Sequence, residues 1–495
     1  MSKNDFTQPR RQSIKGLVLI FLQEGKRGIQ FFWPLLVPVI LGKESDKKIL
    51  IIGLILLAGL ILTLIHSILY YLNFKFNIEN QQFILKKGYL NRKTLTIPLD
   101  RVQNVHTDQT MLQQLLEVMS IEIDTAGSSK KELKIHALSK TIGAQLALEL
   151  SSHLAVQDTA NQEGAKGSVP EEVQILKLTN RDLLRIGISQ NHFRTALIIF
   201  LFGIQFYNKV QEYFEVKAKE YAQEAFLYLS QSGWAIVTAL ILFFLIISFL
   251  YSMIRTLVLF YDLRFLKGNQ SYRIVSGLLN RKNLLIPFTK IQQLDWETGP
   301  LKKVFGIFQV NILQATSDLA AKTKLIEVPG CLIQHIEQLK TDIFGADELK
   351  GKPRIHSFEV YFWRTWLYYG WLPAGLFSPS VFLLDWKYAF GIVVWVIFMF
   401  FYSLMLLRKS YFQVSNDQIR VSSGAISHKF KQMEFHKVQN IEFQQSIFQK
   451  KRGIASLKIG NASGFIMLRF IDEKTAKTLH DYLLYYAETS DKVWM

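Results

Sequence analysis

The chain has 495 residues, of which 49% are hydrophobic and 13% aromatic, with one cysteine and a net charge of +18 at neutral pH. A single cysteine, Cys331, excludes an intrachain disulfide framework and a thiolate metal cluster built from this chain alone. The basic charge alone fits nucleic acid, anionic lipid or the cytoplasmic loops of a membrane protein, so the apolar segments have to decide between them.

The apolar segments come in three pairs, each with a weaker first member and a stronger second one. The strong segments are Ile49 to Leu72, Trp234 to Phe260 and Tyr388 to Leu407, and each is long enough to cross about 30 Å of hydrocarbon at about 1.5 Å per residue. The weaker partners are Ile29 to Leu41, Phe193 to Tyr207 and Trp366 to Phe377. We expect six crossings in three hairpins, with interfacial or re-entrant helices as the alternative for the weaker partners.

Charge predicts the orientation of these hairpins. Their loops, residues 42–48, 208–233 and 378–387, carry charges of +1, −1 and 0, so the whole excess of +18 lies on the other side. The positive-inside rule makes that side the cytoplasm. We therefore expect the N-terminus and all the folded modules to be cytoplasmic, and the basic excess then needs no nucleic-acid partner.

One line of sequence recurs after each apolar pair. It reads GYLNRKTLTIPLDRVQNV from Gly88, GLLNRKNLLIPFTKIQQL from Gly277 and GAISHKFKQMEFHKVQNI from Gly424. The first two copies share nine of these eighteen positions, whereas the third has Glu434 where the others have proline. Such self-similarity predicts three copies of one unit, a membrane hairpin followed by a folded module.

Each module is expected to be mainly β with one closing helix. Phe74, Phe76 and Ile78 alternate with polar residues just after the first strong segment, as in a half-buried strand. The closing helices are predicted over Lys140 to Val156, Cys331 to Phe344 and Asp472 to Glu488, from apolar residues at three- and four-residue spacing. Strands followed by one helix within a hundred residues outline a pleckstrin-homology (PH)-like split barrel, although periodicity alone also allows other small barrels.

The chain therefore divides into eight predicted parts. They are a basic N-terminal segment (1–28), hairpin 1 (29–72), PH-like domain 1 (73–156), a polar linker (157–177), an interfacial segment with hairpin 2 (178–260), PH-like domain 2 (261–346), a linker with hairpin 3 (347–407) and PH-like domain 3 (408–495).

The arrangement resembles bacterial PH-like membrane proteins of the YdbS/YdbT type, in their three-repeat form. The residues that carry the resemblance are the basic turn Asn91-Arg92-Lys93, then Pro98 and Gln103, and a later turn glycine at Gly306 and Gly453, where the first copy has Glu117. The resemblance implies a PH-like fold, a multi-pass protein of the bacterial inner membrane and a shorter single-repeat relative as a partner. It supplies no catalytic residues and no ligand.

Two sets of repeated residues are candidates for function. Basic side chains recur in register and could contact anionic lipid or a partner, or could simply be solvated turn charges: Arg92, Lys93, Arg101, Arg281, Lys282, Lys290, His428, Lys429 and Lys437. A second set is expected to be structural: Gly88, Pro98, Gln103, Gly277, Pro287, Gln292, Gly424 and Gln439. For the glutamines, a bond to a turn backbone is favoured over ligand capture.

The sequence contains no metal-binding, nucleophile-elbow or phosphate-loop spacing. We therefore expect a protein without enzymatic activity, cofactor or metal, acting as a scaffold or accessory in envelope maintenance. Its expected partners are the lipid bilayer, anionic phospholipids and the single-repeat relative, and no nucleic acid. The alternative is a component of a transporter or flippase-like system that moves a lipid or amphiphile.

Overall fold

The structure of the full chain is a computed structural model. The residues described are 6–26, 46–125, 133–159, 172–213, 234–315, 325–345, 348–379, 381, 386 and 388–490. They form two compact units. The first contains residues 1–174 and 262–286, and the second contains residues 175–261 and 287–495. The boundary between the units cuts through the second repeat.

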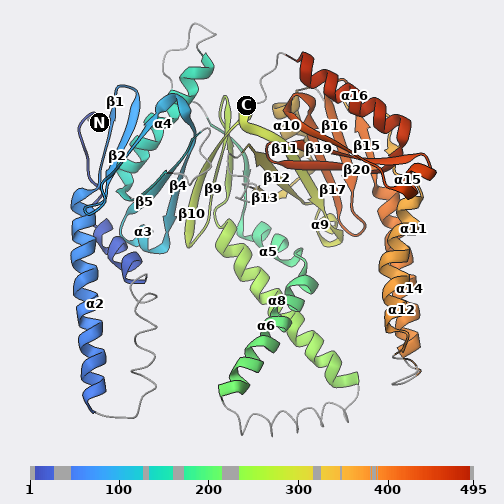
Figure 1. The fold of residues 1–495 in the computed structure, drawn as a ribbon, viewed down its shortest axis with the longest axis horizontal. Helices are drawn as coiled ribbons and strands as arrows, with labels where there is room; N and C mark the ends of the chain where they lie inside the picture. The colour runs from blue at the N-terminus through green and yellow to red at the C-terminus, as the bar shows by residue number, and fades with distance from the viewer. Residues whose placement is uncertain are drawn as a thin grey trace. The chain divides into compact units, whose positions relative to one another are not determined.

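Each repeat contains six strands in two antiparallel sets of three, followed by a helix (Figure 1). The first repeat has β1 (Lys75–Glu79), β2 (Gln82–Lys87), β3 (Lys93–Pro98), β4 (Val102–Thr110), β5 (Val118–Thr125), β6 (Leu133–Ser139) and α4 (Lys140–Thr159). The second has β8 (Arg264–Lys267), β9 (Ser271–Ser276), β10 (Asn280–Pro287), β11 (Ile291–Thr298), β12 (Phe308–Gln314), β13 (Leu325–Cys331) and α10 (Ile333–Phe344). The third has β15 (Tyr411–Val414), β16 (Gln418–Ser423), β17 (His428–Glu434), β18 (Val438–Gln444), β19 (Ile454–Asn461), β20 (Gly464–Asp472) and α16 (Glu473–Thr489). This confirms the predicted PH-like modules and their closing helices.

Alternation along the strands builds the module cores. In the first module, Phe76, Phe83 and Leu85 from the first two strands are fully buried together with Ile121 and Ile135 from the later ones. The closing helix α4 adds Leu146 and Leu150 to the same core, four residues apart on one face. The third module repeats this plan, with Ile419 and Met433 packed against Leu457, Leu479 and Leu483.

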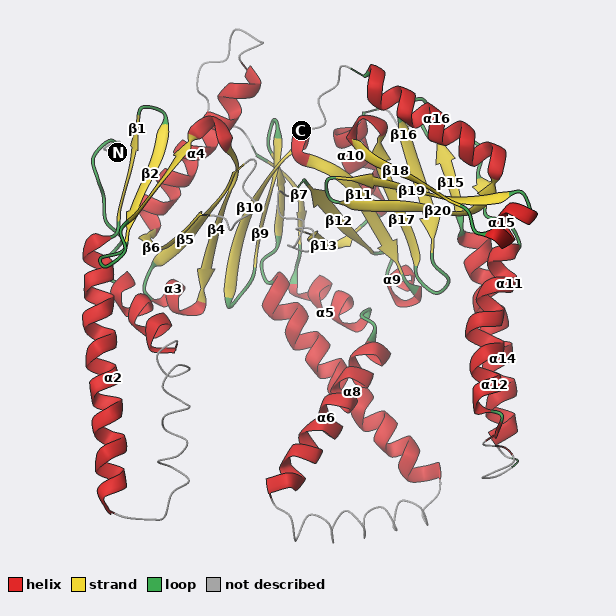
Figure 2. Cartoon of the chain, viewed as in Figure 1, coloured by secondary structure: helices red, strands yellow, loops and turns green. Residues whose placement is uncertain are grey.

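The sheets do not end where the modules end. In the first unit, β4 of module 1 pairs with β10 of module 2, which gives the strand order β6-β5-β4-β10-β9-β8; β7 (Val173–Lys177), where the chain passes between units, is the seventh strand (Figure 2). In the second unit, β11 of module 2 pairs with β17 of module 3 in the order β13-β12-β11-β17-β16-β15-β14, the last being β14 (Ile355–His356). The second half of one module thus continues into the first half of the next.

Three helices are long and apolar enough to cross a membrane. They are α2 (Asp46–Asn73), α8 (Trp234–Phe260) and α14 (Tyr388–Lys409), and they contain the three predicted strong segments. Few side chains in their apolar windows are buried, as expected for helices that face lipid. The protein is therefore a membrane protein with three candidate spans among the described residues.

The three segments predicted as weaker partners differ from one another. The first, Ile29 to Leu41, lies outside the described residues. The second lies in α6 (His192–Tyr213), in which the segment from Arg194 to Gln205 is apolar but shorter than a span. The third is a continuous run of α11 (Val360–Trp366), a π-helical turn (Leu367–Trp371) and α12 (Leu372–Phe377), too interrupted to qualify as a span by length and composition.

The opening glycine of each repeat is required by the turn between the second and third strands. Gly88, Gly277 and Gly424 have φ of +91°, +108° and +99°. A Cβ atom at Gly277 or Gly424 would lie 2.1 Å from the carbonyl oxygen of the residue three positions later. Only glycine fits this combination of a left-handed backbone and close approach, which accounts for its presence in all three copies.

The later turn forms in all three modules although the first lacks glycine. Glu117 has φ of +55°, close to +64° at Gly306 and +63° at Gly453. Because a side chain in this region costs about 1 kcal/mol or more, partly offset by glycine's greater entropy in the unfolded chain, we expect Glu117→Gly to stabilise module 1 by about 0.5 kcal/mol. Thermal unfolding in detergent would measure this. Glu117→Gln is the control, because it removes only the exposed Glu117–Lys15 ion pair (3.1 Å) and should give no gain.

Candidate functional site

The two inter-module junctions have the same register. At the first, Arg281 is opposite Gln109 and Lys282 is opposite Asp108. At the second, His428 is opposite Thr298 and Lys429 is opposite Glu297. Counted from the opening glycines, these are the same repeat positions in both cases. The junction is therefore a repeated, specific interface, which we call the seam.

Each seam places a basic residue of the repeated turn opposite an acid on the preceding module. At the first seam Lys282 faces Asp108, and the side-chain amide of Gln114 donates to the carbonyl of Leu278 (3.1 Å) beside the Gly277 turn. At the second seam the Lys429 Nζ lies 2.9 Å from a Glu297 carboxylate oxygen. Opposite charges facing each other across strands stabilise a pair and fix its register.

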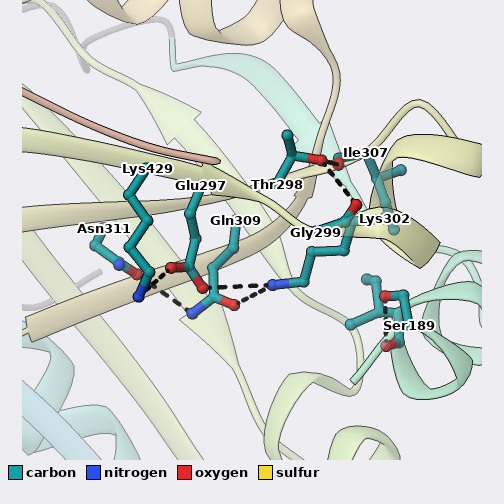
Figure 3. A network of polar contacts seen from close by, with 10 residues as sticks. Ser189, Glu297, Thr298, Gly299, Lys302, Ile307, Gln309, Asn311 and Lys429 are labelled. Carbon is teal, nitrogen blue, oxygen red and sulfur yellow. Dashed lines mark hydrogen bonds and ion pairs between the residues drawn. The ribbon is translucent and has the colours of Figure 1, made fainter. Parts of the chain in front are cut away.

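Figure 3 shows the polar network around Glu297 at the second seam. The Glu297 carboxylate also lies 3.7 Å from the Lys302 Nζ, which donates to the side-chain oxygen of Gln309 (2.7 Å). Lys302 belongs to the short helix α9 (Pro300–Val304), so one carboxylate links three elements from two modules. Burial lowers the pKa of Lys302, and the Glu297 charge opposes that change.

The second seam also contains a buried carboxyl. Asp295 accepts from the Gln293 amide (2.6 Å) and lies 4.0 Å from the Lys431 Nζ. Burial raises the pKa of Asp295 to about 6, against the opposing effect of the Lys431 charge. A carboxyl of this kind favours the folded state more when protonated, so its contribution to stability falls as pH rises from about 4 to about 6.

His428 gives the seam a pH dependence of the opposite sign. Burial, and then the charges of Lys409, Arg354 and Lys303, lower the pKa of His428 to about 4, while its Nε2 lies 2.7 Å from the Ser422 hydroxyl. Since unfolded histidine titrates near 6.5, the unfolded chain takes up a proton below that pH that the folded chain does not.

We therefore expect the contribution of His428 to the free energy of unfolding to fall as pH drops from 7 towards 5, by about 1 kcal/mol after allowance for the partial exposure of the side chain. His428→Asn should remove this contribution from the pH profile of thermal unfolding and leave the opposite contribution of Asp295. His480→Asn on α16 is the control. Equal slopes for the wild type and the His428 variant would contradict the assignment.

The predicted basic residues do not share one environment. Arg281 and Lys282 are exposed, and Arg281 lies 3.8 Å from Asp262. Lys429 is also exposed and is paired with Glu297 at the seam. Lys437 is 5% exposed and donates to the carbonyl of Thr289 (2.9 Å), and Lys290 is half-buried. Arg92, Lys93 and Arg101 of the first module are exposed. The structure thus uses much of this set to join modules, and leaves the first module's members at the surface.

The repeated glutamines mark β-bulges. The register shifts between Val102 and Asn104, between Ile291 and Gln293, and between Val438 and Asn440, so Gln103, Gln292 and Gln439 are the extra residues at the start of β4, β11 and β18. A bulge bends the strand and increases its twist, which suits the corner between two halves of a barrel. Pro98 and Pro287 each end the preceding strand.

Sequence reasoning missed a feature of the short helices after the fourth strand of each module. α3 (Met111–Leu115), α9 and α15 (Ile447–Lys451) expose large apolar side chains at matching positions: Met111, Leu112 and Leu115; Leu301 and Val304; Ile447 and Phe448. Phe448 is 80% exposed. In each unit these short helices lie at the same end of the sheets as the long apolar helices (Figure 1). The signal was present in the sequence as apolar residues after each fourth strand, but a helix of five residues is too short for periodicity to reveal it.

Two hollows in the second unit lie where the modules meet the apolar helices. One, of about 900 Å³, lies between the end of α8 and α9, and its wall includes four cationic and two acidic side chains: Arg194, Arg255, Lys302, Lys429, Glu297 and Glu327. The other, of about 530 Å³, lies between α11, α14 and the strands of module 3. It combines Lys431 and Arg469 with Tyr361, Tyr402 and Phe465.

Within the described ranges, no group of three or more His, Cys, Asp or Glu side chains could hold a metal ion. Cys331 is buried, which raises the pKa of its thiol to about 12 and leaves it protonated.

The repeated modules and the apolar helices that precede them define a membrane protein built from PH-like domains. The chain belongs to the bacterial PH domain family, whose profile matches residues 34–153, 213–345 and 370–487. It is similar to the UPF0699 transmembrane protein YdbT of Bacillus subtilis (strain 168), with 22% identity over 424 residues, which cover 82% of this chain and 84% of that protein. Both findings confirm the resemblance inferred from the repeats.

Proposed function

We propose that this protein is a non-enzymatic membrane scaffold whose PH-like modules form one edge-to-edge array at the headgroup layer, where they bind a membrane-protein partner or anionic lipid. The observation that carries the proposal is the seam. A ladder of hydrogen bonds between consecutive modules, repeated in the same register, favours modules joined at their edges over three independent binding domains.

The seams also support a common face for all three modules. Paired strands must lie on the same side of a bilayer, so an even number of crossings separates β4 from β10 and β11 from β17. This favours one hairpin between modules 1 and 2 and another between modules 2 and 3, with α6 and the α11–α12 run as their weaker members. The charge distribution favours the cytoplasmic face of the bacterial inner membrane. Cysteines placed on the modules should react with an impermeant maleimide from one side only, and labelling from opposite sides would refute the topology.

The short helices favour direct contact with the membrane surface. Exposed apolar residues at the membrane-proximal end of each module can enter the acyl boundary, and basic residues on α9 and α15 suit anionic headgroups. In nanodiscs, a dye on Phe448→Cys should shift to the blue and be quenched by brominated lipid. The same dye on Tyr485→Cys, exposed on α16, should show neither effect. Equal behaviour at the two positions would rule out insertion of α15.

The partner is tested with the basic residues that the seams do not use. Arg92→Ala/Lys93→Ala and a matched pair on α16, Lys474→Ala/Lys477→Ala, would be compared by pull-down in mild detergent and by thermal shift on adding phosphatidylglycerol. Loss of a specific protein, such as a single-repeat relative, from the first variant favours scaffolding. A reduced lipid-induced shift with an intact set of proteins favours headgroup binding. No difference between the variants would remove this surface from the proposal.

A second candidate function is a part in moving a lipid or amphiphile. The hollow beside α11 and α14 favours it, because cationic Lys431 and Arg469 line the same space as aromatic side chains next to a candidate span. Arg469 also donates to the Tyr361 hydroxyl (3.3 Å). Reconstituted wild-type protein that moves a labelled lipid, with loss of movement in Arg469→Ala, would favour this function over the scaffold.

A further inference from the structure

The array has two ends that the chain itself leaves open. Among the described residues, β3 pairs only with β2, and β18 pairs only with β19. The strands equivalent to β3 are β10 and β17, and each pairs across a seam with a strand of the preceding module; we call them entering strands. The strands equivalent to β18 are β4 and β11, and each pairs across a seam with a strand of the following module; we call them receiving strands. At one end of the array the entering strand β3 is therefore unpaired at the seam edge, and at the other end the receiving strand β18 is.

Burial at the receiving end shows what the missing neighbour would cover. In β11, which is paired across a seam, Gln292 and Trp296 are 1% and 4% exposed. At the same positions of β18, Gln439 is exposed and Phe443 is half-buried. The difference follows the presence of the next module, because the two strands otherwise have the same place in their modules.

The entering end shows the same difference. Thr94, Leu95 and Thr96 are exposed in β3, whereas the matching residues of β10, Asn283, Leu284 and Leu285, are half-buried. Pro98 does not prevent pairing, because Pro287 ends β10, a strand that is paired. Unpaired edges with exposed apolar side chains are sites where another strand can add.

Building on the proposed scaffold, we propose that β3 of one molecule pairs with β18 of a second copy of this chain in the seam register, so that the arrays join head to tail. The seam register places Thr94 opposite Phe443 and Lys93 opposite Gln444. Gln444 stands where the internal seams have Asp108 and Glu297, and the nearest acid, Glu442, is on the same face two residues away. A long lysine side chain reaches such a diagonal partner.

The charge match is thus looser than at the internal seams, which suits a junction that forms between molecules and leaves the chain free to dissociate. A head-to-tail junction uses two different surfaces, so it generates rings or open rows of molecules rather than a closed two-fold dimer. With each module held at one membrane face, the junction would extend the array in the plane of the bilayer.

Cysteine cross-linking tests the junction directly, because the native Cys331 is buried and protonated. Full-length Thr94→Cys and Phe443→Cys chains would be mixed in membranes and mildly oxidised. We expect a disulfide-linked dimer from the mixture and a ladder of multimers from the double variant. The control Thr94→Cys with Gln444→Cys places the thiols on opposite faces of the sheet and should remain monomeric.

The outcome separates this inference from the proposed scaffold. The internal pair Thr107→Cys/Asn283→Cys, directly opposed at the first seam, reports on the scaffold alone. An internal disulfide with no 94–443 disulfide would overturn the junction and leave the scaffold intact, and failure of both would overturn both. Equal linkage in the 94–444 control, or linkage of Thr94→Cys only to a different polypeptide, would also overturn the assignment to a second copy.

Discussion

Replacing Trp296 with alanine is expected to lower the free energy of unfolding of the second unit by about 3–5 kcal/mol. The indole is 4% exposed and stacks on Phe430 across the seam, with ring centroids 5.3 Å apart and planes 13° apart. The Lys340 amine and the Arg420 guanidinium lie 5.0 Å and 5.6 Å from its centroid. Truncation removes the stacking and both cation–π contacts and leaves a cavity between modules 2 and 3.

Chemical and thermal unfolding of the full chain in detergent would measure this loss. Tyr485→Ala is the matched control, because it removes an aromatic ring that is 64% exposed on α16 and should change stability by less than about 0.5 kcal/mol. If Trp296→Ala were as mild as the control, the stacked pair could not be an important part of the seam.

The second large effect is expected from Gly424→Ala, at about 2–4 kcal/mol. The new Cβ would meet the Ser427 carbonyl oxygen at 2.1 Å, and φ is +99°, so both sterics and backbone conformation oppose it. The turn precedes β17, the strand that enters the second seam, and a shift of the turn would displace His428 and Lys429 from Thr298 and Glu297. Loss of stability and loss of the seam should therefore appear together.

Gly453→Ala separates the two causes. Gly453 is also left-handed, with φ of +63°, but a Cβ there has no heavy atom within 4 Å. We expect it to cost only about 1 kcal/mol, the backbone term alone. An equal loss of stability in the two variants would contradict this account, because it would mean that the turn can shift to avoid the clash with the Ser427 carbonyl oxygen without losing stability.

The sequence was sufficient for the features that depend on local pattern. The alternation after Phe74 and the three- and four-residue spacing in Lys140 to Val156 gave the strands and helix of module 1, and the long apolar segments gave α2, α8 and α14. Whether the weaker segments span the membrane was harder to predict, because Pro and aromatic residues in a run such as Trp366 to Phe377 fit a broken helix as well as a span. The count of six crossings remains a prediction.

What the sequence could not reveal is the partner of each edge strand. The alternation of apolar and polar residues is the same whether a strand pairs within its module or with the next module. The sequences of β10 and β17 therefore did not indicate a shared sheet. The basic turn residues were therefore weighed as contacts to lipid or a partner, or as solvated charges, and not as contacts between modules. Lys429 beside Glu297, and Lys437 bonded to Thr289, show that such residues can instead hold modules together.

The most direct test of the account is whether the seams exist in the membrane. In one variant, Thr107→Cys/Asn283→Cys is combined with a protease site in the linker predicted at residues 157–177; in another, Thr298→Cys/His428→Cys is combined with a site within residues 346–353. After oxidation and cleavage, the account predicts that each chain runs as one species on a denaturing gel until reductant is added. Fragments that separate without reductant would contradict it.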